Sequence, residues 1–390
     1  MTPARLDITQ PETWPNRRVE DWRWTDVARV LREAPPPSPQ ASVEPGGPFA
    51  GLGGDELAVV NGRAPADARI IADGPGQVAR LRFVSATDGT GHQARIIIEV
   101  KPGADLLLLE SQEGAAAGYV ANHILDIDVG AGGRLTRIVL AADAADALAF
   151  TRADVTMGGH AAFAQTVLTT GAKLQRIETR VSHPGKGASV RLDGLYLLSG
   201  ERHADATSEV DHTGLDGQTS QLTKGVVRER GRGVFQGRII VREGADGTDA
   251  RMGHHALILG DRGEVDAKPE LEIYADDVAC AHGNTVGALD EMALFYLRSR
   301  GVPEAEARAL LTEAFLGEAL DRIEREDVRE VCRAWLAERL SSPPPSSGAE
   351  RGRGTTRRVV EGAAQSAAPD LAPSTASRSP SPAGGGGEER

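Results

Sequence analysis

The sequence predicts a mainly β protein with helical segments at its two ends, and three observations support this prediction. Period-two or wholly aliphatic runs recur between residues 57 and 285, such as ARIIIEV at Ala94–Val100. Glycine-rich turns separate these runs at near-even steps of 13 to 17 residues, at positions 158, 171, 185, 200, 214, 231, 244 and 260. The chain of 390 residues also contains 46 Gly and 22 Pro, and both residue types disfavour the helix interiors of an all-helical bundle.

Two architectures fit this spacing: a parallel coil of strands (a β-helix) and a sandwich of hairpins. Asn-Gly and Asp-Gly pairs at 61, 73, 88, 193, 216 and 246 allow some two-residue hairpins, but they recur too unevenly to set the period. About 230 residues of strand also exceed one ordinary sandwich. We therefore favour the β-helix and keep the sandwich as the alternative.

Residues 1–56 are predicted to form a helical segment followed by a linker. The stretch NRRVEDWRWTDVARVLR at 16–32 predicts a helix that ends at the three prolines 35–37. Its apolar residues fall roughly on one helical face: Val19, Trp22, Val27, Val30 and Leu31. The Pro/Gly-rich stretch 35–56 is typical of a linker or a surface loop, and the β core follows over 57–287.

Three helices are expected over 288–340. Asp290 is a plausible N-cap for EMALFYLRSR, Gly301 suits its C-terminal cap, and Pro303 suits the first turn of a second helix reaching residue 323. A third helix is expected over 327–340. These helices carry too many apolar residues on one face for an isolated helical hairpin, so they should dock on the strands or on a partner. The low-complexity stretch 341–390 is expected to be a disordered tail.

Charge and cysteine content exclude several classes of protein. The net charge is −12 without a basic block, so binding to nucleic acid or to an anionic membrane surface is not expected. The two cysteines, Cys280 and Cys332, cannot form a dense disulfide framework or a four-thiolate metal site. The N-terminus lacks the apolar core of a signal peptide, and the longest aliphatic run, Leu106–Leu109, is far short of the ~20 residues of a membrane span. We expect a soluble, reduced, cytoplasmic protein.

The densest candidate site is KPELEIYADDVACAHGNTVG at 268–287. In a strand, Cys280 and His282 stand at i and i+2 and therefore share one face. A thiolate beside an imidazole suits Fe, Zn or Cu(I). The motif is weak on its own, because a small buried cysteine beside a hydrogen-bonded histidine has the same spacing.

Other polar clusters have a simpler explanation. Asp276 and Asp277 face opposite ways in a strand, and so do His254 and His255, so neither pair suggests an acid/base site. The stretch HADATSEVDH at 203–212 could bind a metal, although we favour a solvated strand edge as its explanation. No phosphate-binding loop, dinucleotide fingerprint or nucleophile elbow occurs, so no bound nucleotide and no obvious enzyme activity are expected.

Three sequence motifs together resemble those of one known protein family. They are GVFQGRI at 233–239, KPELEIYADDVACAHG at 268–283 and FYLRSRG at 295–301, and EDWRWTD at 20–26 looks like the entry helix of the same family. The chain resembles the SufB/SufD family of iron–sulfur cluster assembly proteins over about residues 12 to 340. Within the family it is more similar to SufD-type chains, because SufB-type chains are longer and carry additional cysteines.

The resemblance implies a right-handed parallel β-helix core with N- and C-terminal α-helical segments, acting as a non-catalytic scaffold subunit. It implies a SufB-like sister subunit, a SufC-like ATPase bound through the C-terminal helices, and a cysteine desulfurase system that supplies sulfide indirectly. It also implies that Cys280 and His282 lie at the interface with the sister subunit. There His282 acts as a ligand of a nascent, transient iron–sulfur cluster shared with that subunit, and Cys280 is either a ligand or a packing residue.

The cysteine content agrees with a shared site, since one thiol and one imidazole cannot supply the four ligands that clusters normally take. Two alternatives remain: a SufB-like scaffold that works as a homodimer, and a secreted β-helix enzyme acting on acidic polysaccharide. On the helices over 304–340 we expect outward charges such as Arg322 and Arg325 to form the ATPase docking surface. The alternative is that these helices only cap the strand core.

Overall fold

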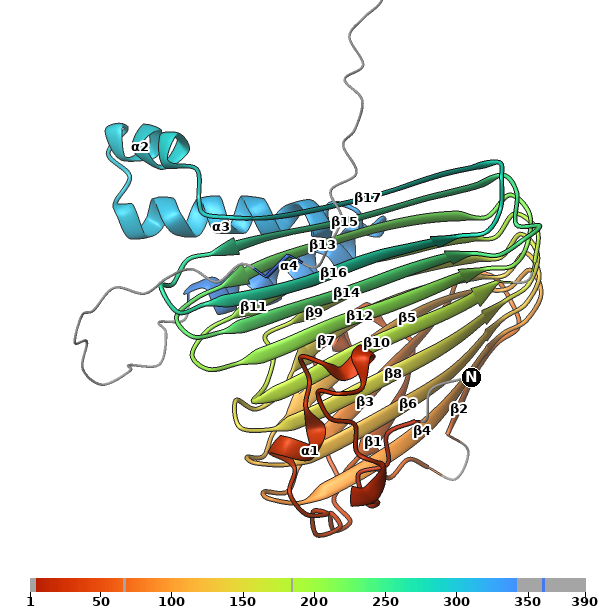
Figure 1. Ribbon diagram of the computed structural model, residues 1–390. Coiled ribbons are helices and arrows are strands. Elements are labelled where there is room, and N and C mark those ends of the chain that lie inside the picture. The colour runs from red at the N-terminus through yellow and green to blue at the C-terminus, as the bar shows by residue number, and fades with distance from the viewer. Residues whose placement is uncertain (1–4, 66–67, 184, 342–359, 362–390) are drawn as a thin grey trace, which may run out of the picture.

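Two facing sheets of parallel strands form a β-helix of about eight turns (Figure 1). The computed structural model describes residues 5–65, 68–183, 185–341 and 360–361. Odd-numbered strands form one nine-stranded sheet and even-numbered strands form the other. Because every pairing between named strands is parallel, the hairpin sandwich is excluded for the described chain.

The strand bounds follow the two sheets. The odd-numbered strands are β1 (Asp55–Val60), β3 (Gln77–Ser85), β5 (Asp105–Gly114), β7 (Arg134–Ala142), β9 (Ala162–Thr169), β11 (Ser189–Leu198), β13 (Gln218–Val227), β15 (Thr248–Ile258) and β17 (Val278–Gly287). The even-numbered strands are β2 (Arg69–Ala72), β4 (Gly91–Val100), β6 (Val120–Val129), β8 (Leu148–Met157), β10 (Leu174–His183), β12 (His203–His212), β14 (Arg232–Val241), β16 (Glu264–Ile273) and β18 (Val360–Glu361).

The glycine period of the sequence corresponds to half a coil. Strands β10 to β13 begin at residues 174, 189, 203 and 218, so consecutive strands start 14 or 15 residues apart. Turn glycines such as Gly171 and Gly200 have positive φ angles of 71° and 65°, which residues with a Cβ rarely adopt. Some turns thus depend on a glycine, whereas others place His160, Asp216 or Glu229 in the same conformation. The predicted alternation of strand and turn is confirmed.

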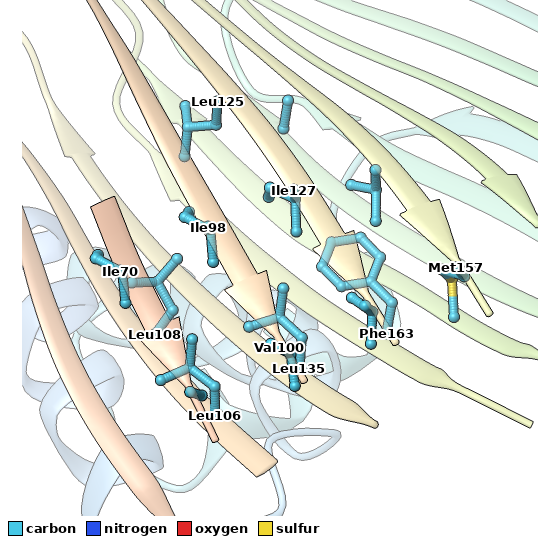
Figure 2. Close-up of a cluster of buried hydrophobic side chains, with 14 of the residues drawn as sticks. Ile70, Ile98, Val100, Leu106, Leu108, Leu125, Ile127, Leu135, Met157 and Phe163 are labelled. Carbon is cyan, nitrogen blue, oxygen red and sulfur yellow. The ribbon is translucent and has the colours of Figure 1, made fainter. Parts of the chain in front are cut away.

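The core lies between the two sheets, where alternate residues of each strand point inward. Figure 2 shows its lower part, in which side chains such as Ile98, Leu108 and Leu125 fill the space between the sheets. All three are fully buried. In this part, aliphatic side chains of each coil stack on those of the coil before it.

One part of this interior is polar. Arg137 of β7 and Glu110 of β5 form an ion pair at 2.6 Å between atoms Nη2 and Oε2, and both side chains are fully buried. Arg137 also donates to Oε1 of Gln165 at 2.6 Å. The coil interior can therefore hold charge where the partner comes from the neighbouring coil.

The N-terminal segment contains far less helix than expected, so the predicted helix over 16–32 is wrong. It consists of three 3-10 turns and one short α-helix: η1 (Pro11–Thr13), η2 (Glu20–Trp22), η3 (Ala50–Leu52) and α1 (Val27–Val30). Strand side chains occupy the backbone groups that a helix would need. Arg176 donates to the Asp21 carbonyl at 2.6 Å, and Nε2 of His203 lies 3.1 Å from the Trp24 carbonyl oxygen.

This segment lies as a strap across the outer face of the even-numbered sheet (Figure 1). Its apolar residues pack there against strand side chains: Leu6, Ile8, Trp14, Val27 and Leu31 against Val120, Leu148, Phe150 and Leu174. The apolar pattern of the sequence therefore marks a buried face, although the backbone that carries it is not a long helix.

The three C-terminal helices are confirmed as α2 (Glu291–Ser299), α3 (Glu304–Leu320) and α4 (Glu326–Ser341). The Asp290 carboxylate caps α2 by accepting from the backbone N–H groups of Met292 and Ala293, and Gly301 follows with a φ of 88°. Helices α3 and α4 pack on the outer face of the odd-numbered sheet, where Leu316 and Trp335 meet Leu195.

The tail predicted over 341–390 lies outside the described residues, except for Ser341 at the end of α4 and for β18. Strand β18 pairs with β16 through Val360 opposite Asp266. Within the described ranges, none of the helices combines the length and the apolar character that a membrane crossing needs.

Candidate functional site

The β-helix ends in an open coil made by β16 and β17. Strand β17 pairs with β15 and is the last strand of its sheet, so its outer edge carries no further described strand. Opposite Cys280 and His282 stand Ala250 and Met252, which are buried and face inward. Parallel partners in register point to the same side, so Cys280 and His282 also face the coil interior, at the end where no further coil covers them.

Cys280 is half-buried and packs beside the cluster of Phe235, Met252 and their neighbours. Burial raises the pKa of its thiol, and the nearby carboxylate of Asp249 adds to this effect, although the backbone N–H of Ala250 opposes it. At neutral pH the thiol is therefore protonated, so binding a metal there would release a proton.

His282 is exposed on the same face, two residues further along the strand. The predicted neighbourhood of thiol and imidazole is thus present in the strand geometry. A cluster needs about four ligands, and no group of three or more metal-binding side chains occurs among the described residues. On this chain, the two side chains can supply only part of a metal or cluster site.

A buried imidazole lies directly beneath this face. His254 of β15 is fully buried and stacks on Phe235 with ring centroids 4.6 Å apart. Its Nε2 lies 2.9 Å from the Tyr196 hydroxyl, and its Nδ1 lies 2.7 Å from Oδ1 of Asn284, which follows His282 on the inward face of β17. Burial lowers the pKa of His254 to about 4, so this ring is neutral at pH 7.

The polar stretch over 203–212 does not form a metal site. Asp205 accepts from Arg176 at 2.9 Å and from Thr25, and Glu209 forms ion pairs with Arg180 and Arg238 at 3.1 and 3.3 Å. These side chains belong to the contact between the even-numbered sheet and the N-terminal strap. The stretch is therefore neither a metal centre nor a bare solvated edge.

The two histidines of one adjacent pair face opposite ways, as predicted, whereas the aspartates of the other pair lie in a turn rather than in a strand. His254 points into the coil, whereas His255 points outward and contacts Thr285 at 2.7 Å. Asp276 and Asp277 lie between β16 and β17, where the Asp277 carbonyl accepts from the backbone N–H of Gly247. Neither pair forms an acid/base site.

Sequence reasoning missed Asn284 and its contact with His254. Asn284 continues the alternation of Cys280 and His282, so the period of two was a usable signal for its face. Its contact with His254 depends on the register between β15 and β17, 30 residues apart in sequence, and no local pattern reveals that register.

The expectation that Arg322 faces outward is wrong. Only 27% of its side chain is exposed. It donates to Oγ of Ser220 at 2.7 Å and lies 3.1 Å from the carboxylate of Asp193, which is fully buried. Arg325 is more exposed and pairs with Asp327 of its own helical segment. Arg322 therefore fastens α3 to the outer face of the odd-numbered sheet.

An apolar stripe is exposed instead on α2, and one large apolar side chain of α3 is exposed as well. Met292, Phe295 and Tyr296 stand three and four residues apart on α2 and are 74%, 66% and 56% exposed. Leu310 of α3 is 45% exposed. Large apolar side chains gathered in this way are typical of a surface that binds another protein.

Comparison with known proteins places the chain in one family. The family model described as "SUF system FeS cluster assembly, SufBD core domain" matches residues 83–315, more than half of the chain. The chain is 35% identical over 245 residues to the iron–sulfur cluster assembly protein SufD of Escherichia coli, covering 60% of this chain and 58% of that protein.

Two further relatives agree. An iron–sulfur cluster assembly SufBD family protein of Synechocystis is 30% identical over 254 residues, covering 62% of this chain and 56% of that protein. A SufBD family protein of Mycobacterium leprae is 32% identical over 233 residues, with coverage of 58% and 59%. The chain therefore spans less than two thirds of the length of each of these relatives. With the matched core, the parallel β-helix and the motif on β17, the chain belongs to the SufBD family of iron–sulfur cluster assembly proteins.

Proposed function

We propose that this chain is a non-catalytic scaffold subunit that pairs with a SufB-type sister subunit and binds a SufC-type ATPase. Its cargo is a nascent iron–sulfur cluster, held transiently between the two scaffold subunits. The observation that carries this proposal is the open coil end, where Cys280 and His282 lie side by side on a face that no further coil covers.

Pairing at this end follows from the unpaired edge of β17. An edge strand presents free backbone N–H and C=O groups, which favour addition of a strand from another chain. A partner strand there would bring its own side chains next to His282. The two ligands of this chain and those of the partner would together reach the number that a cluster takes.

The exposed stripe of Met292, Phe295 and Tyr296 is the proposed docking surface for the ATPase. Each of these side chains is more than half exposed, whereas the guanidinium group of Arg322 is engaged with the sheet. This moves the expected docking surface from the charged residues of 304–340 to the apolar face of α2. A surface with exposed aromatic anchors is typical of an interface that carries binding energy.

The test is a co-expressed complex of this chain with its SufB-type and SufC-type partners. In that complex, His282→Ala should leave the subunit ratio unchanged but reduce the iron and sulfide retained after anaerobic reconstitution. Phe295→Glu should instead lower the amount of ATPase that co-purifies. Arg325→Glu, on the same helical segment but outside the stripe, is the matched control for docking.

The main competing function is a homodimeric scaffold that needs no sister subunit, because the edge of β17 could also pair with a second copy. If the purified chain alone, as a dimer, retains as much cluster as the co-expressed complex, this competing function is correct. Equal cluster retention by wild type and His282→Ala in the complex would refute the ligand role of His282.

A further inference from the structure

A chain of hydrogen bonds from Tyr196 through His254 to Asn284, called the relay below, lies beneath the candidate site. It fixes the orientation of the Asn284 side chain. His254 joins the Tyr196 hydroxyl, 2.9 Å from its Nε2, to the Asn284 carboxamide oxygen, 2.7 Å from its Nδ1. The ring cannot turn freely, because it is fully buried and lies flat on Phe235 with an interplanar angle of 3°.

The hydrogen-bond partners of His254 determine which of its ring nitrogens carries the proton. A carboxamide oxygen can only accept, so Nδ1 of His254 carries the hydrogen and donates to Asn284. Nε2 is then the acceptor, and the Tyr196 hydroxyl donates to it. A protonated ring would have no acceptor for Tyr196, and burial, which lowers the pKa of His254 to about 4, keeps the ring neutral at pH 7.

This arrangement determines which end of the Asn284 amide is available. With Oδ1 turned toward His254, the two N–H bonds of Nδ2 are directed away from that ring. Asn284 stands two residues after His282 on the same inward face of β17, so their Cα atoms are about 6.5 to 7 Å apart. The amide N–H groups thus belong to the same open surface as the His282 imidazole.

The outer face of the same two strands carries a matched pair. His255 and Thr285 stand in the next register position and are in contact at 2.7 Å, just as His254 and Asn284 are. They differ in lying on the outside of the coil, away from Cys280 and His282, where Thr285 is exposed and His255 is half-buried. This pair offers a control with the same strands and the same kind of contact.

We propose that Asn284 donates a hydrogen bond from Nδ2 to a sulfide sulfur of the cluster bound at His282, and that His254 and Tyr196 are its positioning residues. The proposal rests on the function proposed above. A neutral amide does not coordinate iron, but an N–H donor stabilises the negative charge on a cluster sulfur and shifts the reduction potential of the cluster.

Three substitutions test the proposal in the co-expressed complex, reconstituted with ferrous iron and sulfide. Asn284→Asp keeps the acceptor for His254 but removes the N–H donor. Asn284→Ala removes both, and Thr285→Ala is the outer-face control. We expect the cluster to be lost to a chelator about tenfold faster in both Asn284 variants than in wild type or Thr285→Ala, since hydrogen bonds to charged groups are the stronger ones.

A second measurement is independent of the cluster. Long-range proton–nitrogen NMR spectra of the histidine rings should show His254 neutral and protonated on Nδ1, in wild type and in Asn284→Asp. A ring protonated on Nε2 would overturn the relay. Cluster retention in Asn284→Asp equal to wild type would overturn the donor role, whether or not His282→Ala loses its cluster. If His282→Ala also retains its cluster, the proposed function fails and this inference fails with it.

Discussion

At the scale of single residues, the interior of the β-helix contains buried groups whose partners come from neighbouring coils. Arg137 and Glu110 lie 27 positions apart in sequence, yet they form a fully buried ion pair. A local pattern cannot predict this, because in RLTRIVL Arg137 only interrupts an aliphatic run. The pair becomes visible once the coil register places β5 beside β7.

Arg137→Met should lower the free energy of unfolding by about 3–5 kcal/mol, because it leaves the Glu110 carboxylate buried without its partner. The double variant Arg137→Met, Glu110→Met should recover most of this loss, since it removes both charges. Urea denaturation of the three proteins measures the difference. A double variant as unstable as the single one would show that the cost comes from packing rather than from the unpaired charge.

His183 and His212 should make the fold sensitive to acid. Their rings are fully buried in edge-to-face contact with centroids 4.1 Å apart, and burial lowers their pKa values from 6.5 to about 4 and about 3. Between pH 6.5 and 4 the unfolded chain binds protons that the folded chain does not, so stability falls as the pH falls through this window.

His183→Leu should flatten this dependence, by up to about 1.4 kcal/mol per pH unit for the removed group. The measurement is the free energy of unfolding at several pH values between 7 and 4. Thr285→Ala, which changes an exposed side chain that carries no charge, serves as the control and should keep the wild-type slope. If His183→Leu keeps that slope as well, the buried pair is not the source of the acid sensitivity.

At the scale of elements, local patterns predict the C-terminal helices well and the N-terminal strap poorly. Helix α2 has its own cap at Asp290 and its own ending at Gly301, so its bounds follow from local chemistry. The strap also has an apolar face, but its backbone carbonyl groups hydrogen-bond with Arg176 and His203 of the sheet. Such tertiary hydrogen bonds compete with helix formation and cannot be read from spacing alone.

The contact between α3 and the sheet yields a prediction that distinguishes two arginines only three residues apart. Arg322→Glu should lower the free energy of unfolding by roughly 1–3 kcal/mol, because it places a carboxylate next to the buried carboxylate of Asp193. Arg325→Glu should stay within about 0.5 kcal/mol, as exposed substitutions usually do.

Chemical denaturation of both variants is the measurement. Equal destabilisation by the two substitutions would mean that the Arg322 contact does not fasten the helices to the sheet. If only Arg322→Glu is destabilised, a loss of ATPase binding in that variant is explained by displaced helices and does not locate the docking surface.

At the scale of the whole molecule, the glycine period and the aliphatic runs predicted a β-helix, and the structure confirms it. The same alternation placed Cys280 and His282 on one face, which is also confirmed. That this face is the uncovered end of the coil could not be predicted, because it depends on which strand is last in the stack. The hydrogen bond between His254 and Asn284 could not be predicted either, because it joins residues on successive coils.

The central claim is that this open end contributes His282 to a cluster shared with a second subunit. The most direct test is electron–nuclear double resonance on the reduced, reconstituted complex, with isotopically labelled histidine in this chain alone. We predict a nitrogen coupling from the labelled chain that disappears in His282→Ala. A fully loaded wild-type cluster without any coupling to the labelled histidine would contradict the claim.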